Sequence, residues 1–85
     1  MATYRILYWR DIPSQIRAED DAGDVNVALP PKFMERIDAQ AAALGLTGAD
    51  DYLAQWRWSD DEDRDGTAQE VADALCRELE AQADW

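Results

Sequence analysis

The chain has 85 residues, and its 19 acidic and 8 basic side chains give a formal net charge of -11 at pH 7. A chain this short forms one modest core, so residues 1–85 are expected to be a single domain. An apolar content of 47% excludes a disordered chain despite the high charge. Because so acidic a surface repels phosphates and anionic lipid headgroups, we expect neither nucleic acid nor a membrane as a partner.

Two residue types that carry much of protein chemistry are scarce. The chain has no histidine, which removes the commonest general base and metal ligand. Its one cysteine, Cys76, cannot form an intrachain disulfide and is interpreted as a buried, inert thiol. No nucleophile–base pair, phosphate loop or metal cluster stands out, so we expect no enzyme and no cofactor. The sequence has no secretion signal and no stretch that could span a bilayer, which predicts a cytoplasmic protein.

The most apolar and aromatic stretch, residues 4–13 (YRILYWRDIP), predicts the first β-strand. Large apolar side chains fall on both of its faces, which indicates that part of the strand is covered on both sides. Pro13 has no N–H for a neighbouring strand and is expected to end it. We expect four aromatic residues to form or border the core: Tyr8, Trp9, Tyr52 and Trp56.

Two shorter strands and an acidic turn are predicted next. Residues 14–18 alternate polar and apolar and predict a second strand. Residues 19–24 combine consecutive acids with a glycine, which is typical of a solvated hairpin loop. Residues 25–29 alternate again and predict a third strand, with Val25, Val27 and Leu29 facing inward.

The remaining chain predicts three helices. The first begins at Pro30-Pro31 and ends at Gly45, and the second begins at a capping box headed by Thr47 and extends to about Trp58. The third begins at a capping box of Thr67 and Glu70 and extends to about residue 83. The predicted fold class is therefore α+β, with two or three antiparallel strands and three helices packed on one face.

The strongest charge run, residues 59–66, is interpreted as a solvated acidic loop. Residues 61–66 (DEDRDG) match the start of an EF-hand calcium loop, but Ala72 stands where the bidentate glutamate belongs. The helix dipole and the Thr67 cap also explain acids at this place. We therefore expect no metal site.

Residues 25–56 resemble a ribbon-helix-helix unit, in which strands of two subunits pair and enter the DNA major groove. The outward strand residues here would be Asn26 and Ala28, which offer little base readout. Only Lys32 and Arg36 add positive charge in the first helix. A dimeric transcriptional regulator of this kind is thus an alternative reading.

Trp-Arg occurs twice, at Trp9-Arg10 and Trp56-Arg57. Adjacent residues point apart, so each tryptophan can be buried while its arginine is exposed. Our hypothesis is that Arg10, Arg57 and Trp58 form a partner-binding surface, because arginine and tryptophan often carry binding energy. Under the alternative hypothesis the two arginines pair with Asp11 or the Asp60 loop, and Trp58 covers the edge of the core.

Three segments together are similar to a family: YWRDIP at residues 8–13, FMERIDAQAAALG at residues 33–45 and DDYLAQWRW at residues 50–58. Their order and spacing resemble the small bacterial "virulence factor" domain family. The resemblance carries no catalytic residue or cofactor over to this chain. It does imply an accessory role, since some members lie beside genes of cobalamin-linked one-carbon metabolism.

The function expected from the sequence is therefore non-catalytic. We expect a small acidic protein that binds another protein, with a link to methyl-transfer metabolism as the finer hypothesis. Both a monomer and a homodimer are compatible with the sequence.

Overall fold

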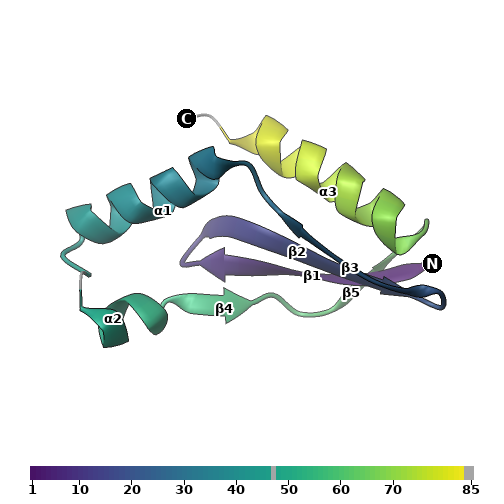
Figure 1. The fold of residues 1–85 in the computed structure, drawn as a ribbon, viewed down its shortest axis with the longest axis horizontal. Coiled ribbons are helices and arrows are strands. Elements are labelled where there is room, and N and C mark those ends of the chain that lie inside the picture. The colour runs from purple at the N-terminus through teal and green to yellow at the C-terminus, as the bar shows by residue number, and fades with distance from the viewer. Residues whose placement is uncertain (47, 84–85) are drawn as a thin grey trace.

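The structure is a computed structural model, and it describes residues 1–46 and 48–83. The elements in chain order are β1 (Ala2–Trp9), β2 (Ile12–Asp20), β3 (Gly23–Ala28), α1 (Pro31–Ala43), α2 (Ala49–Leu53), β4 (Trp56–Trp58), β5 (Glu62–Arg64) and α3 (Ala68–Gln82). Figure 1 shows α1 and α3 along one side of the sheet, while α2 sits at its end beside β4. The predicted α+β class is confirmed, and of the three helices only α1 and α3 form the layer over the sheet.

Strand β1 is the centre of the sheet. It pairs antiparallel with β2 on one side, and with β4 and β5, one after the other, on its other side. The order across the sheet is β3-β2-β1-β4, and the described residues make a 5-stranded sheet. The prediction of two or three strands was too low, because β4 and β5 have only 3 residues each and lack the length of a recognisable strand pattern.

The hairpin between β1 and β2 differs from the predicted first strand. Strand β1 ends at Trp9, because Arg10 takes a positive φ of 57° in the turn. Pro13 does not end a strand but lies inside β2. Leu7 lies opposite Gln15 and Tyr8 lies opposite Pro13, so Ser14 is an extra, unpaired residue. This bulge accommodates the proline, whose missing N–H would interrupt a regular ladder.

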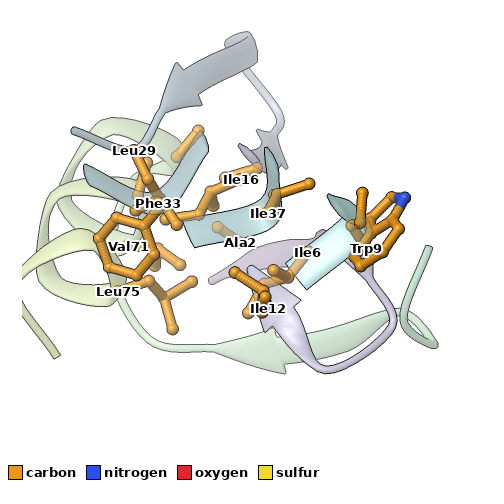
Figure 2. Close-up of a cluster of buried hydrophobic side chains, with 14 residues drawn as sticks. Ala2, Ile6, Trp9, Ile12, Ile16, Leu29, Phe33, Ile37, Val71 and Leu75 are labelled. Atoms are coloured by element: carbon orange, nitrogen blue, oxygen red, sulfur yellow. The ribbon is translucent and has the colours of Figure 1, made fainter. Parts of the chain in front are cut away.

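The core lies between the sheet and the two long helices (Figure 2). Ile6 and Ile16 are paired across β1 and β2, and both are buried. The helices add buried apolar residues at helical spacing, namely Phe33, Ile37 and Ala41 from α1 and Val71, Ala72 and Leu75 from α3. All buried residues among those described are apolar.

Trp9 lies at one end of this cluster and is completely buried at 0% exposure (Figure 2). Its Nε1 donates a hydrogen bond to the Tyr52 carbonyl oxygen at 3.0 Å, and the two ring centroids are 5.6 Å apart. Tyr52 in turn meets the Trp56 ring edge-on at 6.1 Å. The prediction that Tyr8, Trp9, Tyr52 and Trp56 form or border the core is confirmed, with Trp9 the one fully buried.

The second predicted helix was too long. Helix α2 ends at Leu53, and Trp56 to Trp58 form strand β4 instead of a last helical turn. The spacing of Tyr52 and Trp56 is helical, but pairing with β1 decides the conformation. Gly48 is the N-cap of α2 and makes no side-chain cap, while the predicted cap Thr47 lies outside the described residues.

Helix α3 begins as predicted and is tied to the β2–β3 hairpin. Thr67 Oγ1 accepts a hydrogen bond from the Glu70 N–H at 3.2 Å, and Glu70 Oε1 accepts one from the Thr67 N–H at 3.1 Å. Asp20 at the end of β2 accepts a bond from the Ala68 N–H at 2.7 Å. These bonds, with those from the turn N–H groups of Ala22 and Gly23, lower the pKa of Asp20.

We expect Trp9→Ala to lower the free energy of unfolding by about 3–5 kcal/mol, because it empties a fully buried site and removes the bond to α2. Trp58→Ala, at a partly exposed position, should cost about 1 kcal/mol or less. Urea denaturation measures both. Equal losses for the two variants would contradict the placement of Trp9.

We expect Asp20→Asn to destabilise the fold at pH 7 but not at acid pH. The folded-state pKa of Asp20 is lowered, so its contribution is complete above the unfolded pKa and is lost as pH falls through the folded one. The thermal midpoints of wild type and variant should therefore converge as the pH falls through the folded-state pKa of Asp20. Asp21→Asn, an equal change of charge in the same turn, is the control and should not show this convergence.

Candidate partner-binding site

Two kinds of contact are seen among the arginines of the sheet. Arg17 pairs with Asp24 at 2.7 Å and with Glu19 at 3.5 Å, and Arg64 pairs with Glu78. By contrast, the arginines along β1 and β4 make no ion pair with any residue in the described part of the chain; these are Arg5, Arg10 and Arg57. Arg5 and Arg57 lie over aromatic rings instead, and Arg10 donates a hydrogen bond to a side-chain amide.

The pairing of β1 with β4 fixes their positions. Tyr8 lies opposite Arg57, and Leu7 lies opposite Trp58. The ladder is extended at one end by the bond from the Arg10 N–H to the Gln55 carbonyl oxygen at 3.0 Å. Since β4 is the outermost strand here, one side of its backbone has no neighbouring strand in the described sheet.

Arg57 lies over the ring of Tyr8, with Cζ 5.3 Å from the ring centroid. Tyr8 is two residues from Ile6 along β1, so this pair lies on the face of the sheet that carries the core. The Arg57 side chain is exposed beyond the ring. A guanidinium stacked on an aromatic ring keeps its N–H groups available at its rim.

Trp58 follows Arg57 in β4, so it lies on the opposite face of the sheet. Neither α1 nor α3 covers that face (Figure 1). Its ring is stacked by Arg5, whose Cζ is 4.9 Å from the ring centroid, and Trp58 remains 42% exposed. The Nε atom of Arg5 is buried without a hydrogen-bond partner. This face of β4 therefore presents an exposed aromatic ring, while the Arg5 Nε atom is shielded from solvent.

Arg10, Arg57 and Trp58 all lie along the short β1–β4 ladder, with Arg10 beyond one end, Arg57 in the middle and Trp58 at the other end. Arg10 Nη1 donates to Gln55 Oε1 at 3.2 Å, so this side chain is held beside the residue before β4. Arg57 and Trp58 are consecutive in a strand and point to opposite faces, so the three residues surround the edge of the sheet and do not form one flat patch. The alternative pairings with Asp11 or the Asp60 loop are not present among the described residues.

Two residues of this site were not predicted from the sequence. Arg5 and Tyr8 supply the stacking partners of Trp58 and Arg57. If residues 56–58 had been predicted as a strand, pairing with the aromatic end of β1 would have been the natural expectation. The helical spacing of Tyr52 and Trp56 predicted a helix instead.

The acidic run is more ordered than predicted. Strand β5 (Glu62–Arg64) lies inside the stretch interpreted as a solvated loop and pairs with the start of β1. Glu62 accepts a bond from the Tyr4 hydroxyl and Asp63 one from the Thr3 hydroxyl, both at 2.8 Å. The bond to Glu62 is the main cause of a raised Tyr4 pKa. Two acids of the calcium-like segment are thus engaged in the sheet.

Other chemistry has little support in the described structure. No group of three or more histidine, cysteine or acidic residues is placed to hold a metal ion in residues 1–46 and 48–83. Cys76 is half-buried, and burial raises the pKa of its thiol, which keeps it protonated and weakly nucleophilic. None of the described helices has the length and apolar character needed to cross a membrane.

A family model described as virulence factor matches residues 7–84. The chain belongs to this family. The match begins within β1 and includes Arg10, Arg57 and Trp58, while Arg5 lies before it. No curated protein and no solved structure matches the chain.

We expect no calcium binding of micromolar affinity at residues 61–66, because Ala72 replaces the bidentate ligand and Glu62 and Asp63 already accept hydrogen bonds. Isothermal titration of the protein with calcium measures this. A single micromolar site that disappears in Asp63→Ala, but not in Asp21→Ala, would show that the loop is a calcium site after all.

Proposed function

We propose that this member of the virulence factor family is a non-catalytic accessory protein that binds another protein around strand β4. The binding surface consists of Arg10, Arg57 and Trp58, supported by Arg5 and Tyr8. The observation that carries the proposal is that these arginines have no carboxylate partner in residues 1–46 and 48–83, although the chain is rich in acidic residues.

The stacked guanidinium groups favour an external acceptor at this place. A guanidinium that already lies on a ring loses little freedom when it meets a carboxylate, and the pair formed is a strong, charge-assisted one. A partner segment with carboxylates or backbone carbonyl groups would supply what the site lacks.

The exposed aromatic area also supports a protein-binding role for this surface. Trp58 presents a ring that is 42% exposed, beside the outer edge of a strand. Tryptophan and arginine are enriched among the residues that dominate binding energy at protein interfaces. The site is small, so it fits an extended segment of a partner better than a broad flat surface.

The finer hypothesis concerns the identity of the partner. We propose an enzyme of cobalamin-linked methyl-transfer metabolism, on the strength of the family resemblance alone. The alternative, a ribbon-helix-helix-like regulator, has less support, because the exposed strand residues Asn26 and Ala28 offer little base readout.

We expect the double variant Arg57→Ala with Trp58→Ala to lose the partners that the wild-type protein retains from native extract. It removes one unpaired guanidinium and the exposed ring while leaving the buried core intact. Affinity capture followed by mass spectrometry measures the loss, after circular dichroism has established that the variant is folded.

The matched control is Arg77→Ala with Leu44→Ala, which removes the same charge and an exposed apolar side chain from other elements. If the folded Arg57 and Trp58 variant captures the same proteins as wild type, or if the control loses them equally, the site is not a partner-binding surface.

A further inference from the structure

The two edges of the sheet are built differently. On the β1 side the edge is interrupted, because β4 and β5 are short strands separated by residues 59–61. On the other side β3 runs without a break, since its register with β2 is continuous from Gln15↔Ala28 to Asp20↔Gly23. Natural sheets usually protect an edge with proline, lysine or a bulge. Strand β3 has none of these, and its one charged residue, Asp24, is bonded to Arg17 of its own sheet.

The direction of the β3 backbone groups follows from one hydrogen bond. The Leu29 N–H donates to the Ser14 carbonyl oxygen at 3.0 Å, so residue 29 faces β2. In an antiparallel ladder every second residue faces the same neighbour. Val27, Val25 and Gly23 therefore also face β2. The N–H and C=O groups of Asp24, Asn26 and Ala28 point away from the sheet.

We propose that β3 pairs antiparallel with β3 of a second copy of this chain, about a twofold axis at Asn26. In this register Asn26 lies opposite Asn26 of the other copy, and Asp24 lies opposite Ala28. All outward backbone groups of the strand then have partners, because residues 24, 26 and 28 are placed symmetrically about the axis. A closed twofold dimer requires such self-complementarity.

The side chains fit the same register. Val25 and Val27 are only partly buried within one copy and lie on the face that carries the core. Across the axis each would lie opposite the other, forming the β-branched cross-strand pairs that stabilise sheets. On the other face the exposed Asn26 carboxamides meet, and each can both donate and accept. Asp24 meets alanine, so no like charges are directly opposed.

The ends of the interface are complementary in charge. Beyond Asp24 the hairpin turn with Asp21 extends toward Pro31 of the other copy, where helix α1 begins. That helix has no acidic residue in its first turn and no side-chain cap. The positive end of its dipole favours the acidic turn of the other copy. The net charge of -11 per copy opposes association as a whole, so added salt should strengthen the dimer.

The dimer does not depend on the proposed function, because β3 and β4 lie on opposite edges of the sheet. Each copy would keep its own β4 site at a far end of the continuous sheet. Loss of partner capture and loss of dimerisation are therefore separate results.

Sedimentation equilibrium of the full chain tests the proposal. We expect wild type to dimerise more tightly as salt increases. Asn26→Pro removes an outward N–H without touching the β2–β3 ladder, and should raise the dimer Kd roughly tenfold or more. Asn26→Ala keeps that N–H and should raise the Kd much less. A wild-type protein that stays monomeric at high concentration and salt, or a dimer unaffected by Asn26→Pro in a variant folded by circular dichroism, would overturn the proposal.

Disulfide cross-linking tests the register, in a Cys76→Ala background under mild oxidation. Asn26→Cys should give a covalent dimer by itself. Asp24→Cys should not, because in this register two copies of residue 24 are four residues apart along the strands, about 13 Å. Mixing Asp24→Cys with Ala28→Cys should restore the cross-link. If Asp24→Cys links to itself as efficiently as Asn26→Cys, the proposed register is wrong.

Discussion

The backbone pairing of β1 on both of its sides is the constraint on which the rest of the structure depends. With β2 on one side and β4 and β5 on the other, β1 joins the two halves of the described sheet, since β4 and β5 pair with β1 and the β2–β3 hairpin lies on its other side. Its side chains then contact the core, helix α2 and strand β4. Ile6 meets the core, Trp9 meets α2, and Arg5 and Tyr8 meet β4. The candidate site is thus a by-product of the same pairing that completes the sheet.

Some arginine side chains of this protein are held in place by aromatic rings, and others by carboxylates. Arg17 and Arg64 are neutralised by carboxylates in exposed ion pairs, which contribute little to stability. Arg5 and Arg57 are instead held by Trp58 and Tyr8, which immobilises the guanidinium without satisfying its charge. In a chain of net charge -11, two guanidinium groups are thus held along β1 and β4 by rings and not by carboxylates of the described residues.

Local signals in the sequence were sufficient where local interactions decide the structure. The Thr67 and Glu70 capping box, the alternation at residues 25–29 and the apolar spacing of α1 all correspond to observed elements. The failures away from the first hairpin concern β4 and β5, whose conformation comes from pairing with a distant strand. Tyr52 and Trp56 have helical spacing, and residues 62–64 have the acidic composition of a solvated loop. Neither stretch therefore has a sequence pattern that predicts a strand. For the same reason the sequence placed Arg57 and Trp58 together but could not supply their partners on β1.

The pairing of Ala2 with Arg64 has a consequence for how the chain folds. The hairpin of β1 and β2 joins neighbours in sequence, whereas β4 and β5 must close large loops to reach the other side of β1. Contacts of this kind slow folding, because chain entropy is lost before they form. Until residues 52–64 are in place, one side of β1 therefore has no neighbouring strand and Trp9 lacks its contact with Tyr52. An unpaired edge of this kind is prone to aggregation in a partly folded chain.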